Sequence, residues 1–110
     1  MIEVRFLRKS GNLVAFTYEG HADFDDYGKD IVCAAVTAQC MMVYNGLEEV
    51  MKIKNRIDLD DEGGYLSVSI DSASLVEKKN AQVLMETLLL GIKAIESQYG
   101  NSIKLIEEEV

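Results

Sequence analysis

A long apolar segment that begins at Ile31 and runs to about Met51 constrains the fold more than any other feature of the chain. Asp30, directly before this segment, is a good helix N-cap, so we predict a helix that starts at Ile31. Apolar residues lie almost all round this helix, whereas an ordinary surface helix carries them on a single stripe. Such a helix must be covered on more than one side, which predicts a sheet on one side and a second subunit of a homodimer on another.

Alternation of apolar and polar residues predicts strands on both sides of this helix. The predicted elements are, in chain order, strands at 1–8 and 13–19, the helix at 31–51, strands at 56–61 and 66–70, a helix between the caps at 71–74 and Gly100, a short strand from Ile103, and an acidic tail at 107–109. The second helix carries a predicted core stripe of Val76, Leu84, Leu88, Ile92, Ile95 and Tyr99. The order β-β-α-β-β-α-β predicts an α+β fold: a two-layer sandwich with two helices packed on a largely antiparallel sheet. A chain of 110 residues is long enough for a single domain, at 1–110.

The charge balance limits the partners. The chain has 11 basic and 19 acidic residues, a net charge of −8. Such a surface repels nucleic acid and anionic membranes and attracts basic proteins. The start of the chain lacks the pattern of a secretory signal, and the apolar stretch 31–43 is short for a membrane span. We therefore expect a cytoplasmic protein that makes no direct contact with nucleic acid or membrane.

Two side chains suggest chemistry: His21, the one histidine of the chain, and Cys33. If Asp30 is the N-cap, Cys33 is the third helical residue, and the amides of residues 31–33 have no intrahelical acceptor. Those amides would form an oxyanion hole, and the positive end of the helix would favour a thiolate. His21 could pair with that thiolate and protonate a leaving amine. An ionised Asp30 would oppose the thiolate, so we expect it to act as a brace that caps the helix or orients His21.

Other interpretations of the same residues remain open. Cys33 could be a small buried hydrophobe and His21 a surface or capping residue. Cys40 has apolar neighbours along the helix and is expected in the core; a disulfide with Cys33 is excluded because the two lie about two helical turns apart. That separation also makes a poor tetrahedral metal site, and the aspartates of 23–26 lack the spacing of a calcium loop. We expect no metal and no cofactor, and the lack of a nearby resolving cysteine disfavours a thiol-redox enzyme.

A two-part motif carries a family resemblance. Gly20-His21-Ala22, a spacer, and then Gly28-x-Asp30-Ile31-Val32-Cys33-Ala34-Ala35-Val36-Thr37 resembles the signature of the ribosomal-processing cysteine protease family (Prp). The resemblance extends over the whole chain in length and element order. It implies a homodimeric cysteine endopeptidase that removes a short N-terminal extension, ending in an aromatic residue, from ribosomal large-subunit protein number twenty-seven.

Matched by position, the resemblance implies that Cys33 is the nucleophile, His21 the general acid and base, and Asp30 a supporting acid. Gly20 and Gly28 match the hinges of a flexible loop that runs between the two halves of the motif. The whole chain would then be one cysteine-protease domain.

The resemblance also bears on the substrate. A basic ribosomal protein suits the charge of −8. An aromatic residue before the scissile bond needs an apolar pocket, for which Phe24, Tyr27 and Tyr44 are candidate walls. Thr37 stands where the family often has serine, so a hydroxyl is retained. The alternative function is a non-catalytic acidic module that binds a basic ribosomal protein, in which Cys33 would be buried and ordinary.

Overall fold

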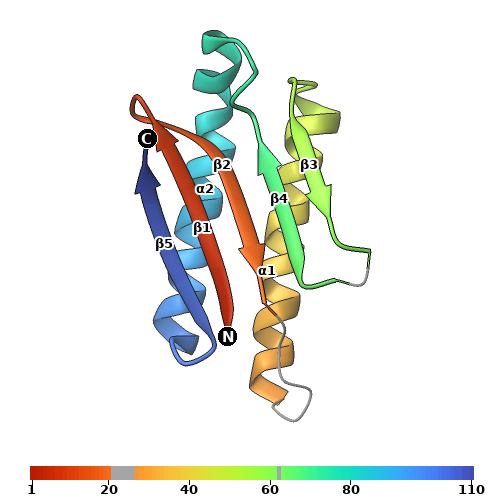
Figure 1. Cartoon of the computed structure of the whole chain (residues 1–110), viewed down its shortest axis with the longest axis vertical. Helices are drawn as coiled ribbons and strands as arrows, with labels where there is room; N and C mark the ends of the chain where they lie inside the picture. Colours follow the sequence, from red (N-terminus) through yellow and green to blue (C-terminus); the bar gives the residue numbers. More distant parts are fainter. Residues whose placement is uncertain (21–26, 62) are drawn as a thin grey trace.

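Two helices pack on one face of a five-stranded sheet (Figure 1). The computed structural model describes residues 1–20, 27–61 and 63–110. Its elements are β1 (Ile2–Lys9), β2 (Asn12–Glu19), α1 (Tyr27–Asn45), the π-helical η1 (Gly46–Val50), β3 (Arg56–Leu59), β4 (Tyr65–Ser69), α2 (Leu75–Tyr99) and β5 (Ile103–Glu109). The strand order is β3-β4-β2-β1-β5, and the β1–β5 pair is parallel while the other three pairs are antiparallel. The predicted α+β, two-layer sandwich is confirmed.

Local sequence explains several boundaries of these elements. Ser10 and Gly11 both adopt positive φ (51° and 84°) in the turn of the β1–β2 hairpin. Ser74 caps α2 through a capping box: its hydroxyl accepts from the Glu77 amide, and the Glu77 carboxylate accepts from the Ser74 amide. α2 ends before Gly100, as the sequence predicts.

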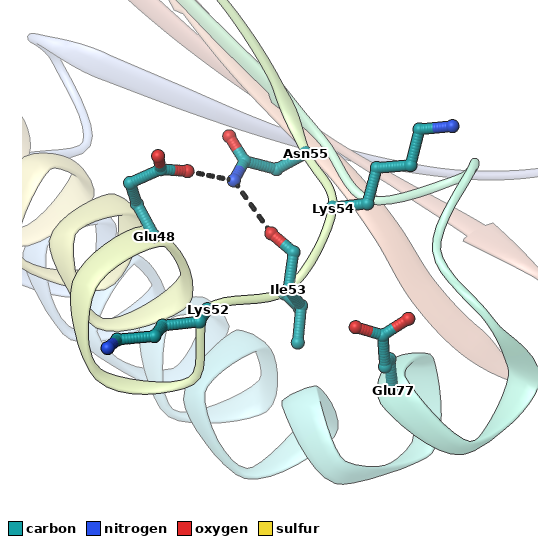
Figure 2. Close-up of a pocket in the computed structure, with 6 residues that line it drawn as sticks. All are labelled: Glu48, Lys52, Ile53, Lys54, Asn55 and Glu77. Carbon is teal, nitrogen blue, oxygen red and sulfur yellow. Dashed lines mark hydrogen bonds between the residues drawn. The ribbon is translucent and has the colours of Figure 1, made fainter.

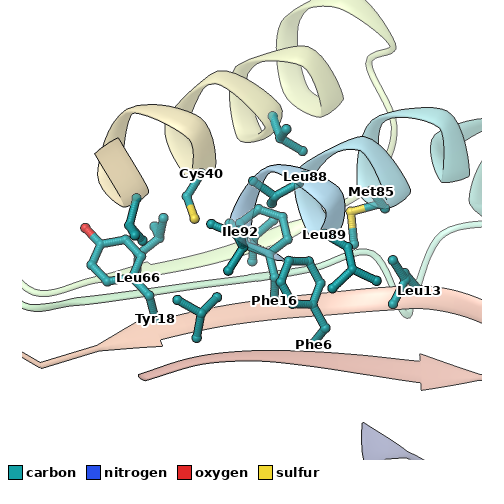
Figure 3. Close-up of a cluster of buried hydrophobic side chains, with 14 of the residues drawn as sticks. Phe6, Leu13, Phe16, Tyr18, Cys40, Leu66, Met85, Leu88, Leu89 and Ile92 are labelled. Atoms are coloured by element: carbon teal, nitrogen blue, oxygen red, sulfur yellow. The ribbon is translucent and has the colours of Figure 1, made fainter. Parts of the chain in front are cut away.

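The core lies between the sheet and the helices, as Figure 3 shows. Phe6 of β1 and Phe16 of β2 are directly paired, with ring centroids 6.1 Å apart. α1 contributes a buried stripe at helical spacing, made up of Val32, Val36, Cys40 and Val43, which continues into Leu47 of η1. α2 contributes Ala81, Met85, Leu88, Leu89, Ile92 and Ile95.

The predicted core stripe of α2 is wrong at its two ends. Val76 is 70% exposed and Tyr99 is 39% exposed. Val76 lies nine residues before the buried Met85, which is about 180° round the helix at 100° per residue, so Val76 faces solvent. Tyr99 is on the buried side of α2 but is its last residue, and this 25-residue helix extends roughly 37 Å, whereas an eight-residue strand such as β1 extends roughly 27 Å. The end of the helix at Tyr99 therefore lies past the sheet.

The predicted start of the first helix is also wrong. α1 begins at Tyr27, so Asp30 is its fourth residue and does not cap it. Extending a helix adds a backbone hydrogen bond for each residue fixed, and the chain contains no proline that would prevent the extra turn. The capping preference of Asp30 is a local effect of about 1 kcal/mol, which such an extension can outweigh.

The acidic C-terminal segment is part of the sheet. β5 runs through to Glu109 and pairs along its whole length with β1, so the predicted short strand and free tail are wrong. Two cations compensate the charge: Arg5 forms an ion pair with Glu108, and Lys93 lies 3.6 Å from Glu107. Pairing with a central strand therefore overrides the poor strand propensity of glutamate.

The stretch Ile31–Val50 is long and apolar enough, by length and composition alone, to cross a membrane. It is longer than the stretch 31–43, which is short for a membrane span. A core helix has the same property, and the buried stripe of α1 packs against the sheet.

Candidate active site

Cys33 lies in the second turn of α1, at the margin of the core. Its side chain is partly exposed, and its thiol is free. Gln39 and Gly46 face the other helix, because their nearest neighbours across the gap are Gly91 and Leu84 of α2. At 100° per residue, Cys33 projects from the opposite side of the buried stripe. The thiol is thus on the open flank of α1, away from α2.

Cys40 has a different environment on the same helix. It is fully buried, and its sulfur points from α1 toward the sheet (Figure 3). Burial raises the pKa of the Cys40 thiol to about 12. A fully buried thiol that stays protonated at neutral pH is a poor nucleophile, so Cys40 is not a candidate for the reaction. The expectation that Cys40 is a core residue is confirmed.

A side-chain hydrogen bond joins α1 to the sheet one turn after Cys33. The Thr37 hydroxyl donates to the phenol oxygen of Tyr18 on β2, over 3.1 Å. Alternation of side chains along the strand places Tyr18 on the buried face of the sheet, but no sequence pattern identifies its partner, which is 19 positions away along the chain. Tyr18 is thus a residue near Cys33 that was not among the predicted site residues.

Gly20 ends the strand that leads to His21. Its φ is 119°, and a Cβ at this position would collide with the carbonyl oxygen of Met1 and lie 3.2 Å from the Ile2 Cα. Its amide donates to the Gly64 carbonyl over 2.9 Å. Both the positive φ and the close approach of Met1 favour glycine at this position, and its role as a hinge stays a prediction.

The observed helix start changes the expected electrostatics of Cys33. Because α1 begins at Tyr27, the amides of residues 31–33 lie beyond the first turn and face intrahelical carbonyl acceptors. They do not form the predicted oxyanion hole in this conformation. The helix dipole also acts mainly within the first turn, so it gives Cys33 less support than its predicted position would have done.

Of the other predicted site residues, His21 and Phe24 lie outside the described residues. Tyr27 and Gly28 are the first two residues of α1, so the predicted loop does not extend to Gly28; their side chains, like that of Asp30, lie outside the description. Tyr44 is partly buried about three turns, or roughly 16 Å, along the helix axis from Cys33, so the structure does not bring these two side chains together.

A cavity of about 650 Å³ lies at the other end of α1, around Glu48 and Glu77. Figure 2 shows that Lys52 and Lys54 extend in opposite directions there, while Asn55 donates to the Glu48 carboxylate. The cavity is polar and remote from Cys33, so we do not assign it to the reaction. Within the described part of the chain, no cluster of three histidine, cysteine or acidic side chains could hold a metal ion.

Comparison with known proteins identifies similar sequences. The family model described as cysteine protease Prp matches residues 1–104. The ribosomal processing cysteine protease Prp of Staphylococcus aureus (strain Mu50 / ATCC 700699) is 31% identical over 96 residues, which cover 86% of this chain and 87% of that protein. The protein of the same name from Bacillus subtilis (strain 168) is 28% identical over 94 residues, covering 84% of each.

Solved structures agree with the sequence matches. SMU.848 from Streptococcus mutans superposes with a TM-score of 0.89 at 30% identity, covering 100% of this chain and 96% of the other. An essential ribosomal processing protease Prp from S. aureus, in complex with a substrate peptide, gives a TM-score of 0.84 at 28% identity, covering 98% and 100%. The same S. aureus protease with a covalently linked product peptide gives 0.83 with the same identity and coverage.

Proposed function

The chain belongs to the cysteine protease Prp family, and we propose that Cys33 is its nucleophile. A cysteine protease must draw its nucleophile from its cysteines, and this chain has two. The single observation that carries the choice is their contrast in burial: Cys40 is fully buried with a pKa of about 12, whereas Cys33 is partly exposed. A thiolate that attacks a peptide must be accessible, and this supports Cys33.

His21 is the proposed general acid and base, since it is the one imidazole of the chain. The Cys33 thiolate attacks the scissile carbonyl carbon, the C–N bond breaks, and His21 protonates the departing amine. Water deprotonated by His21 then attacks the thioester, which releases the acid and restores the thiolate. The covalently linked product peptide of the S. aureus protease supports such an intermediate.

Asp30 is proposed as a supporting residue that orients His21. The capping role is excluded because Asp30 is the fourth residue of α1. Its position one turn before Cys33 on the same helix supports an orienting role. Gly20, directly after β2, and Gly28, the second residue of α1, stay the proposed hinges.

The proposed substrate is the N-terminal extension of ribosomal large-subunit protein number twenty-seven, cleaved in the cytoplasm. Support comes from the relatives, which are named for ribosomal processing, and from the charge of −8, which suits a basic ribosomal protein. The same charge supports the absence of direct contact with nucleic acid or membrane. Phe24 and Tyr27 stay as proposed walls of the substrate pocket, whereas Tyr44 is too far from Cys33.

The proposed homodimer forms through the outer face of the two helices. On α1 the exposed apolar residues are Ile31, 42% exposed, and Met42, 62% exposed; on α2 they include Val83, 75% exposed, and Leu90, 67% exposed. At 100° per residue, each pair points within about 20° of one direction from its helix, away from the buried stripe. We call these four residues the outer helix patch. Exposed apolar side chains gathered on one face are typical of protein interfaces, which supports a contact between two copies.

The alternative, a non-catalytic acidic binding module, requires Cys33 to be buried and ordinary. Its partial exposure and the membership of the chain in a protease family argue against this alternative.

The test is incubation of the purified protein with the extended ribosomal protein, followed by mass spectrometry. We expect loss of the N-terminal extension with the wild type and no cleavage with Cys33→Ala or His21→Ala. Cleavage by Cys33→Ala at the wild-type rate would show that the nucleophile is assigned wrongly. Cleavage of an unrelated basic protein with the extension left intact would show that the substrate is wrong.

A further inference from the structure

We propose that Tyr18 is a positioning residue for the reaction, because its phenol fixes the helix that carries Cys33 against the strand that leads to His21. This inference rests on the roles proposed above for Cys33 and His21. Tyr18 touches no reacting atom in this arrangement. It acts through Thr37, the partner of its hydroxyl.

The location of the contact is what gives it this role. Tyr18 is 6% exposed and lies two residues before Gly20, at the end of β2. Thr37 follows Cys33 by one helical turn, so the two side chains are neighbours on the same flank of α1. The 3.1 Å bond between Thr37 and Tyr18 therefore joins the two parts of the chain that must bring Cys33 and His21 together.

The Tyr18 end of this hydrogen bond is anchored in the sheet. Tyr18 pairs with Val4 of β1 and with Leu66 of β4, one on each side. Two residues later, the bond from the Gly20 amide to Gly64 continues the attachment of this strand. Movement of Tyr18 would disturb strand pairing on both sides, so its hydroxyl is a fixed reference point.

A directional contact matters here because the described residues of α1 that are fully buried against the sheet are apolar. Val32, Val36 and Cys40 are fully buried, but apolar burial has no preferred direction and tolerates small shifts along the helix axis. A hydrogen bond has a defined length and angle. Since a misplacement of about 1 Å can cost on the order of 10²-fold in rate, the phenol would matter for catalysis beyond its share of stability.

The test compares Tyr18→Phe and Thr37→Val with a matched control. Thr17, the neighbour of Tyr18, faces the opposite side of the sheet, and its hydroxyl forms a similar hydrogen bond with Ser67 over 3.0 Å. Thr17→Val therefore removes an equivalent hydroxyl pair that does not touch α1. For each variant, kcat and KM are measured on a peptide spanning the N-terminal extension, together with the melting temperature.

We expect Tyr18→Phe and Thr37→Val each to lower kcat about tenfold with little change in KM, and the double variant to be no worse than either single one. Thr37→Ser keeps the hydroxyl and should restore kcat to within about twofold of the wild type. Thr17→Val should lower the melting temperature about as much as Tyr18→Phe and Thr37→Val do, and it should leave kcat unchanged.

Wild-type kcat in Tyr18→Phe would overturn the inference, as would an equal loss of kcat in Thr17→Val. Neither result concerns the proposed function, which fails separately if Cys33→Ala still cleaves the same peptide. If Cys33→Ala is inactive and Tyr18→Phe is fully active, the inference about Tyr18 is wrong and the nucleophile is right.

Discussion

Cys33 and Cys40 lie about two turns apart on α1, and the protein buries one completely while leaving the other partly exposed. The buried thiol of Cys40 has its pKa raised to about 12, since its charged form would lose its hydration. Two residues of the same type on one helix are thus divided into a core residue and a candidate nucleophile.

This contrast predicts selective alkylation. Iodoacetamide should modify Cys33 alone in the folded protein and modify Cys40 only after denaturation, as peptide mass spectrometry would show. The proposed pairing of His21 with Cys33 should speed this reaction, because an imidazole can take up the thiol proton. His21→Ala tests the pairing and should be alkylated more slowly at Cys33. Equal labelling of both cysteines in the folded state would contradict the assigned burial.

A second prediction concerns Gly20. Gly20→Ala should lower the free energy of unfolding by about 3 kcal/mol, because positive φ and a collision with the Met1 carbonyl act together. Gly11→Ala is the matched control: its φ is also positive, at 84°, but the new Cβ meets nothing within 4 Å. The control should lose only about 1 kcal/mol. Urea denaturation measures the free energy of unfolding of both variants. Equal decreases in that free energy would show that no collision occurs at Gly20.

The ion pair between Arg8 and Glu86 should make stability depend on pH. The Arg8 guanidinium donates to both carboxylate oxygens of Glu86 over 3.0 and 3.1 Å, and this hydrogen bonding lowers the pKa of Glu86. A lowered pKa contributes stability above the ordinary carboxyl value, and that contribution is lost as pH falls through the folded-state value.

Glu86→Gln should therefore lower the melting temperature at pH 7, by at most about 5 °C because the pair is partly exposed to solvent. The difference from the wild type should shrink as the pH falls below the ordinary carboxyl range. Asp58→Asn is the control, since its partner Arg56 is 80% exposed and little change is expected. A difference that grows in acid would contradict the sign of the pKa shift.

The outer helix patch predicts the oligomeric state. Wild-type protein should sediment as a dimer at micromolar concentration, and Leu90→Glu should sediment as a monomer, because a charge buried in the interface without a partner is costly. Leu59→Glu is the matched control: Leu59 is 55% exposed, but it lies on β3, outside the patch. A monomeric wild type would contradict the dimer. Equal dissociation of Leu59→Glu would show that the interface lies outside the outer helix patch.

Much of the fold could be predicted because its signals are local. Three short-range patterns of the sequence correspond to elements of the structure: the alternation in β1 and β2, the turn at Ser10 and Gly11, and the capping box of Ser74. The errors occur where segments far apart in the chain meet. β5 extends through its glutamates because β1 pairs with it along its whole length.

The sequence by itself determined the element order, the candidate residues and, through the two-part motif, the family. It named Cys33 and His21 because residue type and spacing are properties of the chain alone. Only the tertiary structure decided that α1 begins at Tyr27, that β5 extends through its glutamates and that Tyr18 meets Thr37. The physical reason is that burial and hydrogen-bond partners depend on residues distant in the chain, and a local sequence pattern does not identify those residues.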